Sequence, residues 1–376
     1  MRSHERWAYL RNSATIAWNV ALRGRYDFAF DWMPMEIRGM SAAQRLNILR
    51  AGLNLFHRRL HPWSWPLHMQ VELTSFCNLR CPVCPVGTGE LTRAPKAIDV
   101  DLFRRLMEEV GPYLLTLSLW AWGEPLLHPE LERVLAITAG YPAATLLSTN
   151  GQNLDRDGVQ NALRKHPPHY LIVAIDGLSD ETNSLYRKGA RLEPALDGVR
   201  ALAQWKRETG SRRPALVFRF LAMKHNEHEL PRLREFAAGN GFDMVSTRTL
   251  SIIDSSDEAH RALVPEADLM RAYGYHEDKR VRRDDFVCQH AFNFPTVFAD
   301  GTVVACEQDF NGSHPYGVLS RETSFGGIWF SRAAAEIRKK IRDDPAQFSF
   351  CENCPFADRE TSSCSLDCYP VRPAEV

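Results

Sequence analysis

Long hydrophobic runs are missing from this 376-residue chain: no stretch of about 18 apolar residues occurs, and none follows the basic start at Met1–Arg6. This absence argues against a membrane-spanning helix and a secretory signal peptide. Net charge is missing too, because 46 basic residues balance 46 acidic ones. Such a balance does not favour a nucleic-acid partner. We therefore expect a soluble protein in a reducing, cytoplasmic setting.

A fourth ligand is missing from the most conspicuous motif. Cys77, Cys81 and Cys84 lie within eight residues, and their spacing lets three thiolates converge on one soft metal centre. A closed zinc site or a cubane iron–sulfur cluster usually takes four protein ligands. A cubane held by three thiolates keeps one iron open for another ligand. The alternatives are a structural zinc knuckle or unrelated buried thiols.

This C-x3-C-x2-C spacing, placed after an alternating apolar segment at 69–76, resembles the cluster loop of the radical S-adenosylmethionine (radical SAM) superfamily. The resemblance implies a [4Fe-4S] cluster on Cys77, Cys81 and Cys84. It implies that the open iron binds the amine and carboxylate of S-adenosylmethionine (SAM). One electron, from a donor such as flavodoxin or ferredoxin, would then cleave SAM to a 5′-deoxyadenosyl radical.

Between residues 69 and 250, short apolar runs alternate with helical periods, which is typical of β/α units around a parallel sheet. We predict strands near 69–76, 115–121, 144–149, 170–175, 215–222 and 243–249. We predict helices near 100–113, 128–139, 154–165, 194–209 and 228–239. Six units are too few for a closed eight-stranded barrel. The fold class is therefore α/β, with the partial (β/α)6 TIM-like barrel that the resemblance implies.

Polar turns follow these strands, where α/β folds bind ligands. Gly123 and Glu124 are similar to the family's Gly-Gly-Glu-Pro segment, which receives the SAM ammonium, although Trp122 replaces the first glycine. Ser148 and Asn150 suit ribose hydroxyls.

After the fourth strand, Ala174 stands where the family commonly has serine. Arg187 becomes a candidate for the SAM carboxylate, because a guanidinium fork fits that group. An ordinary turn at Gly123–Pro125 and a surface ion pair of Arg187 are the alternatives.

Six further cysteines follow residue 287: Cys288, Cys306, Cys351, Cys354, Cys364 and Cys368. Asp300-Gly301 predicts a tight hairpin that returns Cys306 towards Cys288. The spacing C-x12-G-x4-C, then C-x2-C, resembles the auxiliary iron–sulfur domain called SPASM, or its shorter form, twitch. We therefore expect one or two auxiliary [4Fe-4S] clusters and a small Cys-rich domain at 288–376.

Two ligand sets stay open. The twitch-like set binds one cluster through Cys288, Cys306, Cys351 and Cys354. The SPASM-like set places one cluster on Cys288, Cys306 and Cys368, and another on Cys351, Cys354 and Cys364. A zinc site on Cys351, Cys354, Cys364 and Cys368 is the structural alternative.

Residues 1–68 lack lysine but contain ten arginines, four acidic residues and many aromatics. Ser41 and Gln44 form a capping-box pattern for a helix. Its apolar stripe is Leu46, Leu49, Leu53 and Phe56. We expect a helical extension whose stripe covers the barrel; peripheral contact with an anionic membrane, or with a partner, is the alternative. Residues 251–287 are predicted to be a linker or a lid.

These observations predict a radical SAM oxidoreductase that abstracts hydrogen from a small molecule, such as a sugar, aminocyclitol or lipid head group. An auxiliary cluster would accept an electron. Asp309 is the candidate for proton handling, with His290, Arg219 and Arg248 as further options. A maturase of ribosomally made peptides is the alternative among enzymes, although the extension has no clear strand alternation. A non-catalytic metal-binding scaffold is the alternative of another class.

Overall fold

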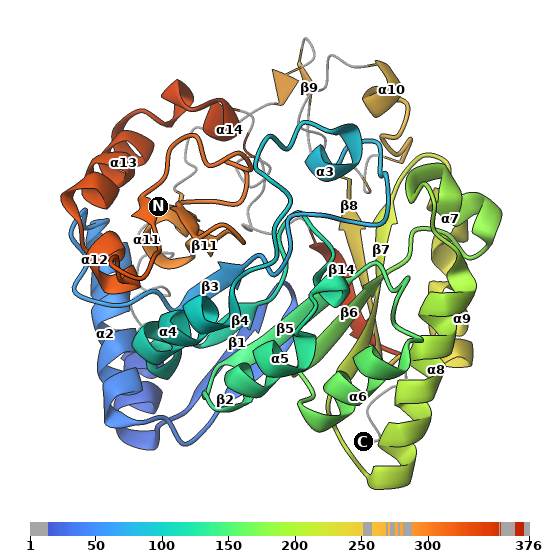
Figure 1. Ribbon diagram of the computed structural model, residues 1–376, viewed down its shortest axis with the longest axis horizontal. Helices are drawn as coiled ribbons and strands as arrows, with labels where there is room; N and C mark the ends of the chain where they lie inside the picture. Colours follow the sequence, from blue (N-terminus) through green and yellow to red (C-terminus); the bar gives the residue numbers. More distant parts are fainter. Residues whose placement is uncertain are drawn as a thin grey trace.

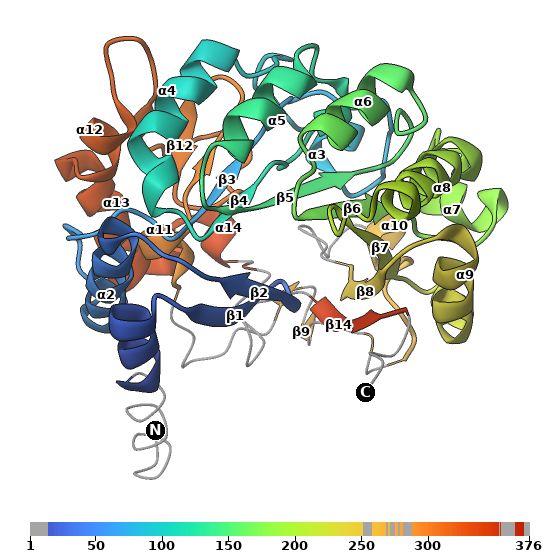
Figure 2. The same ribbon diagram turned by 90° about the horizontal axis from the view of Figure 1, so that it is seen from below.

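A curved ten-stranded sheet forms an incomplete barrel with helices on its outer face (Figures 1 and 2). The computed structural model describes residues 14–250, 258–267, 270, 275–276, 279–280, 288–352, 354 and 365–371. The predicted linker or lid at 251–287 lies mostly outside the described residues. Its described part contains the short helix α10 (Glu258–Arg261) and the two-residue strands β9 (Tyr275–His276) and β10 (Lys279–Arg280).

Six consecutive parallel strands occupy the centre of the sheet, as predicted. They are β3 (His68–Val71), β4 (Thr116–Ser118), β5 (Ala144–Thr149), β6 (Tyr170–Ala174), β7 (Ala215–Ala222) and β8 (Met244–Thr249). The first is shorter than predicted. The Glu72 amide still donates to the Val297 carbonyl oxygen (2.9 Å), but beyond it Leu73 accepts a bond from the Ile98 amide (2.9 Å) and Thr74 bridges Ala97.

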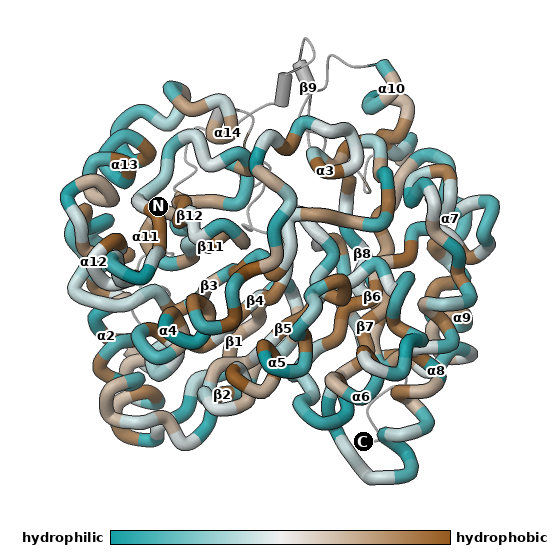
Figure 3. Tube along the Cα trace, viewed as in Figure 1, coloured by the Kyte–Doolittle hydropathy of each residue, from teal (hydrophilic) through white to brown (hydrophobic). Residues whose placement is uncertain are grey.

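Helices cover the outer face because each carries one apolar side. The long ones are α4 (Val100–Val110), α5 (Leu131–Ala139), α6 (Asp157–Lys165), α8 (Leu192–Thr209) and α9 (Leu233–Asn240). Short segments join them: α3 (Pro85–Thr88), η2 (Gly111–Tyr113), η3 (Pro125–Leu127), α7 (Asp180–Tyr186) and η4 (Glu227–Arg232). Asp99 caps α4 by accepting from the Leu102 amide (2.8 Å), which directs Phe103, Leu106 and Met107 into the core. Figure 3 shows the hydrophobic colour concentrated along the inner strands.

The C-terminal region extends the same sheet. Strand β11 (Thr296–Val297) pairs in parallel with β3, and β12 (Thr302–Val304) and β13 (Gly317–Val318) follow antiparallel. The predicted hairpin is confirmed: Gly301 adopts a φ of 93°, and Asp300 accepts from the Thr302 amide. The remaining elements are α11 (His290–Asn293), α12 (Phe325–Trp329), α13 (Arg332–Asp343), η6 (Pro345–Gln347), α14 (Ser349–Glu352) and β14 (Ser365–Pro370). Strand β14 pairs antiparallel with β8 at the opposite edge.

The N-terminal extension contains a β-hairpin that the sequence analysis missed. After the helical turn η1 (Asn19–Arg23), strands β1 (Tyr26–Phe30) and β2 (Met33–Ile37) pair antiparallel across a two-residue loop. Side chains of β2 belong to the same buried cluster as residues of β5, β6 and β7. The hairpin therefore closes one end of the barrel (Figure 2).

Helix α2 (Ala42–His57) exists as predicted, and Ser41 caps it by accepting from the Gln44 amide (3.1 Å). The helix covers the barrel as expected, because Ile48 and Ala51 belong to the same buried cluster as β5 and β6, but most of the predicted stripe faces outward. Leu46, Leu53 and Phe56 are 47%, 50% and 64% exposed, whereas the rest of the buried face carries the amide side chains of Gln44, Asn47 and Asn54. Within the described residues, every helix is too short or too polar to span a lipid bilayer.

Candidate active site

The cysteine triplet lies on a loop after β3, at the carboxyl edge of the parallel sheet. Cys77, Cys81 and Cys84 are each half-buried, and α3 begins directly after Cys84. Gly87 of α3 packs on the loop so closely that an added Cβ would lie 2.2 Å from the Cys81 carbonyl oxygen. This glycine, which the sequence analysis did not identify, fixes the shape of the cysteine loop.

Burial raises the pKa of Cys77 to about 11 and that of Cys81 to about 12. A bound metal cation reverses such a shift by deprotonating its thiol ligands. In the part of the chain that the structure describes, no three Cys, His, Asp or Glu side chains converge on one ion position. A cubane does not require this, because each of its irons takes its own cysteine. The donor set therefore fits a cluster.

The turn after β4 lies against the backbone that leads into the triplet. An added Cβ on Gly123 would lie 1.8 Å from the Thr74 carbonyl oxygen, so only glycine fits. The Glu124 amide donates to the Phe76 carbonyl oxygen (2.9 Å), and the Thr74 hydroxyl donates to the Glu124 carbonyl oxygen (2.7 Å). These contacts hold the predicted SAM-binding turn beside Cys77.

The Glu124 carboxylate is buried and accepts three hydrogen bonds. The Thr149 hydroxyl (2.7 Å) and the Leu126 amide (2.9 Å) donate to Oε1, and the Asn150 amide donates to Oε2 (2.8 Å). Burial raises the pKa of Glu124, and these donors partly offset that effect. The carboxylate is thus fixed in orientation at the ends of β4 and β5.

Asn150 connects β5 to the cysteine loop. Its side-chain amide donates to Asn78 Oδ1 (2.8 Å) and approaches Cys77 Sγ at 3.5 Å. Ser148 is half-buried near the end of the same strand. The structure thus brings Asn150, Glu124 and Cys77 together.

Arg187 forms an ion pair with Asp176, with 2.7 Å between Nε and Oδ2. The alternative of a surface pair is wrong, because the side chains of Arg187 and Asp176 are 12% and 0% exposed. Burial alone would lower the pKa of Arg187, but Asp176 and Cys81 raise it above its usual value. The same guanidinium lowers the pKa of Cys81 against the larger effect of burial, so a fixed positive charge lies near the cysteine loop.

Four later cysteines surround a second small cavity: Cys288, Cys306, Cys351 and Cys354. His290, Ala291, Ala305, Ile341 and Phe350 complete its lining. Burial raises the pKa of Cys306 well above its usual value, and Glu307, Cys354 and Cys288 add to this effect. The structure therefore brings together the four cysteines of the twitch-like ligand set.

The other C-terminal candidates lie elsewhere. Cys364 falls outside the described residues, and Cys368 lies on β14 at the far edge of the sheet order. Asp309 is buried and accepts from the Ser313 amide and the His314 amide, each at 2.8 Å, through its two oxygens. This arrangement favours a turn-stabilising role for Asp309 over the expected proton handling.

A larger pocket of about 560 Å³ lies between the hairpin, the barrel and the C-terminal region. Its lining combines aromatic, charged and amide side chains: Phe30, Asp31, Trp32, His68, Gln70, Trp120, Arg248, Gln289, His290, Asn293, Phe294 and Glu307, with Ala29. His290 lines both this pocket and the cavity between the four cysteines. Of the proton-handling options, His290 and Arg248 therefore lie in a place suited to a substrate.

The hairpin loop supplies the charge at the floor of this pocket. Asp31 and Trp32 adopt φ values of 53° and 63°, as a two-residue hairpin loop of this type requires. Asp31 pairs with Arg248 at 2.9 Å and also with Arg219, whose side chain is 5% exposed. A left-handed tryptophan is costly, and such strain gathers at functional sites. The sequence analysis missed this contribution because it missed the hairpin.

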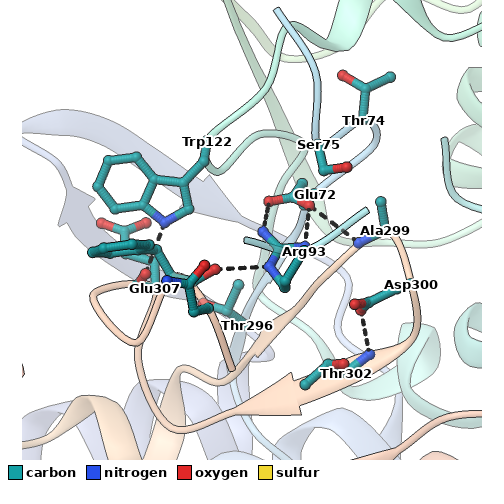
Figure 4. Close-up of polar contacts among 12 residues, drawn as sticks. Glu72, Thr74, Ser75, Arg93, Trp122, Thr296, Ala299, Asp300, Thr302 and Glu307 are labelled. Carbon is teal, nitrogen blue, oxygen red and sulfur yellow. Dashed lines mark hydrogen bonds and ion pairs between the residues drawn. The ribbon is translucent and has the colours of Figure 1, made fainter. Parts of the chain in front are cut away.

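A buried ion pair joins the cysteine loop to the C-terminal region (Figure 4). Arg93 donates to both Glu72 oxygens at 2.8 and 2.7 Å, and to the Phe310 carbonyl oxygen at 2.7 Å. Trp122 donates through its indole nitrogen to the Glu307 carbonyl oxygen at 2.8 Å. The turn carrying Gly123 and the residue after Cys306 are therefore directly connected.

Two family models match the chain: the radical SAM superfamily over residues 71–237, and the SPASM iron–sulfur cluster-binding domain over residues 288–355. Among curated proteins, a cofactor-modifying protein of tungsten-containing aldehyde ferredoxin oxidoreductase from Pyrococcus furiosus is 24% identical over 49% of this chain and 51% of its own. PqqA peptide cyclase from Granulibacter bethesdensis is 23% identical over 49% and 46%. The chain spans about half the length of these relatives.

Solved structures share the fold at lower identity. SuiB from Streptococcus suis, bound to S-adenosylmethionine, has a TM-score of 0.58 and 15% identity, over 84% of this chain and 79% of its own. BtrN, in complex with AdoMet and 2-DOIA, has a TM-score of 0.50 and 19% identity, over 82% and 99%. With both family models matched in order and this fold shared, the chain belongs to the radical SAM superfamily and carries a SPASM iron–sulfur cluster-binding domain.

Proposed function

We propose that this protein is a radical SAM oxidoreductase that acts on a small polar molecule bound in the 560 Å³ pocket. Cys77, Cys81 and Cys84 would hold the [4Fe-4S] cluster. Gly123, Glu124, Ser148, Asn150 and Arg187 would bind SAM beside it. The reduced cluster and SAM, when bound, supply a 5′-deoxyadenosyl radical.

The protein's own residues prepare this site by fixing charges and removing steric bulk. Three donors orient Glu124, so that its carboxylate needs little reorganisation to receive an ammonium group. Gly123 lets this turn pack directly on the Thr74 carbonyl group, in the backbone that leads to Cys77. Arg187 provides a buried positive charge that suits a carboxylate.

The residues that line the pocket are the main support for this class of substrate. Aromatic rings of Phe30, Trp32, Trp120 and Phe294 suit the C–H face of a ring. Asp31, Glu307 and the amides suit hydroxyl or amino groups. A sugar, an aminocyclitol or a lipid head group meets both requirements.

We place the auxiliary cluster on Cys288, Cys306, Cys351 and Cys354, which border a cavity that shares His290 with the substrate pocket. Oxidation of an alcohol to a carbonyl removes two electrons and two protons. One hydrogen atom would be taken by the 5′-deoxyadenosyl radical. A cluster held by these four cysteines would accept the remaining electron, and a pocket base or water would accept the remaining proton. A flavodoxin- or ferredoxin-type donor and an oxygen-poor cytoplasm complete the proposal.

The test is an anaerobic assay of the reconstituted enzyme with SAM and dithionite. We expect 5′-deoxyadenosine, and loss of this product in Cys77→Ala. A panel of sugars, aminocyclitols and phospholipid head groups would then be screened for deuterium transfer from the substrate into 5′-deoxyadenosine. Absence of 5′-deoxyadenosine from protein with a full iron content would overturn the proposal.

Peptide maturation is the second candidate, and one observation favours it. Strands β1 and β2 form a two-stranded sheet to which no third strand is added within the described residues. A sheet edge can bind an extended peptide through backbone hydrogen bonds. PqqA peptide cyclase and SuiB bound to precursor peptide SuiA are among the similar proteins. Deuterium transfer from a labelled precursor peptide, with none from the small-molecule panel, would favour this candidate.

Metal analysis distinguishes the two enzymatic candidates, the oxidoreductase and the peptide maturase, from a non-catalytic scaffold. Two cubanes require about eight irons per chain, and Cys351→Ala should lower this number by about four. Zinc without iron would favour the scaffold.

A further inference from the structure

Exposed apolar side chains are concentrated in the N-terminal extension. Eight of the eleven large hydrophobic side chains that are exposed in the described residues come from residues 16–63: Ile16, Trp18, Leu22, Trp32, Leu46, Leu53, Phe56 and Trp63. Trp18, Leu22, Phe56 and Trp63 are each more than half exposed. A concentration of this kind marks an interaction site.

Buried amides on α2 hold this apolar side outward. Gln44 donates to the Leu114 carbonyl oxygen (3.3 Å), and Asn47 both accepts from the Trp65 amide (2.9 Å) and donates to its carbonyl oxygen (3.3 Å). Asn54 accepts from the Trp63 amide (3.0 Å) and donates to the Ser64 hydroxyl (2.6 Å). Rolling the helix to bury its leucines would break these bonds. The exposed stripe is therefore a fixed feature.

Helix α2 and η1 pack against each other, and the chain that leads into the hairpin runs beside α2 in Figure 2. Arg45 joins the two elements by donating to the Ala21 carbonyl oxygen at 3.1 Å. We name the surface formed by η1, α2 and Trp63 the α2 face.

The charge of the α2 face is positive, because η1 and α2 contain Arg23, Arg45 and Arg50 and no acidic residue. Residues 14–68 carry seven arginines and three acidic residues. All three acids are paired: Asp27 and Glu36 with arginines of the hairpin, and Asp31 inside the barrel. Arg23 and Arg50 are exposed and form no ion pair within the described residues. Arg59 lies 3.5 Å from the ring centroid of Trp63, which anchors a cation on an exposed aromatic.

We propose that the α2 face binds the surface of an anionic lipid bilayer. Leucine, phenylalanine and tryptophan side chains would enter the boundary between head groups and acyl chains, while arginines contact lipid phosphates. The positive charge favours an anionic bilayer over a neutral partner. This inference goes beyond the proposed reaction and does not depend on it.

Flotation of the full-length holoenzyme with vesicles tests the inference. Neutral vesicles would contain phosphatidylcholine alone, and anionic vesicles 30% phosphatidylglycerol. We expect at least ten-fold tighter binding to anionic vesicles. We expect a ten-fold loss in Leu53→Asp and a loss of about five-fold or more in Arg50→Glu.

Matched controls are Leu185→Asp on α7, where the leucine is 55% exposed, and Arg207→Glu on the exposed side of α8. Both should bind vesicles like the unmodified protein. Unchanged cluster absorbance and SAM cleavage would show that Leu53→Asp is folded. Binding that is absent, insensitive to lipid charge or equally affected by the controls would overturn the inference. A dimer in light scattering that Leu53→Asp dissociates would replace it with self-association.

Discussion

At the residue scale, Trp122 links the two metal-binding regions. Its indole donates to the Glu307 carbonyl oxygen, and its ring meets Phe310 at 6.0 Å and 72°. The turn that it begins carries Gly123 and Glu124. Where the family segment has a glycine, this chain has a side chain that reaches the residue beside Cys306. The link is therefore a property of this sequence.

Replacing Trp122 with phenylalanine should cost about 1 kcal/mol of unfolding free energy, because it removes one hydrogen bond and keeps most of the ring packing. Trp122→Gly should cost about 2–4 kcal/mol, because it removes the ring as well. Anaerobic denaturant titration of the holoenzyme measures both. Trp205→Phe on α8 is the matched control, and a loss as large there would contradict the specific role of the indole.

The free energy of unfolding should depend on the protonation of His169, the residue directly before β6. Its Nδ1 accepts from the Thr145 amide at 3.0 Å, and burial lowers its pKa to about 4. In the unfolded chain the pKa of His169 has its ordinary value of about 6.5. Between about pH 4 and pH 6.5 the unfolded chain therefore binds more protons than the folded chain. Stability should fall as pH decreases from about 6.5 to about 4, by at most about 1.4 kcal/mol per pH unit from this group.

His169→Asn keeps an acceptor for the Thr145 amide and removes the titration. Its stability should fall less steeply with decreasing pH than that of the unmodified protein. Denaturant titrations at several pH values between 7 and 5 measure the difference. If the unfolding free energies of the two proteins fell equally with decreasing pH, the predicted contribution of His169 would be excluded.

At the scale of elements, strands with two buried faces were easy to predict and others were not. Strand β7 matches its prediction to the residue because nearly every side chain of Ala215–Ala222 is apolar. Strand β1 was missed although Tyr26, Phe28 and Phe30 alternate with smaller or polar residues. Its loop, Asp31-Trp32, lacks the Asn-Gly or Asp-Gly signal that identifies a hairpin.

The orientation of α2 could not be predicted from its periodicity. Apolar side chains normally choose the buried face of a helix. Here the backbone groups of Trp63, Trp65 and Leu114 need hydrogen-bond partners, and amides of α2 provide them. The requirement of a distant backbone segment decided which face is buried, and no local pattern contains that information.

The loop that follows the cysteine triplet depends on the buried Glu72–Arg93 pair. Arg93→Met should cost about 3–5 kcal/mol, because it leaves Glu72 charged and buried without its partner. The double variant Glu72→Leu/Arg93→Met should recover most of that loss. Lys165→Met breaks the exposed Lys165–Glu132 pair and should cost less than about 1 kcal/mol. Equal losses for Arg93→Met and Lys165→Met in denaturant titrations would contradict the prediction.

At the scale of the whole molecule, the barrel and the C-terminal region share one sheet. Strand β11 pairs with β3, and β14 pairs with β8, so the region after residue 287 contributes to both edges. The sequence predicted the order of the cysteine groups, because their spacing is local. It did not predict the shared sheet or the 560 Å³ pocket, since both require segments more than 200 residues apart to meet.

A chain that ends at residue 287 should therefore not behave as a soluble barrel. Removal of β11 leaves β3 as an unpaired edge and exposes apolar residues such as Val71 and Leu73. We expect aggregation during expression, and binding of a hydrophobic dye by any soluble fraction. A monomeric truncated chain with native thermal stability would show that the barrel folds independently.

The shared sheet also limits how this protein can change over evolutionary time. Domains joined by a linker can be exchanged between genes as units. Here the register that pairs Thr296 with Gln70 and Val297 with Val71 must survive any exchange, together with the contacts of Arg93. A barrel and an auxiliary region taken from different relatives would rarely meet that condition. The two halves of the site are therefore expected to have been inherited together.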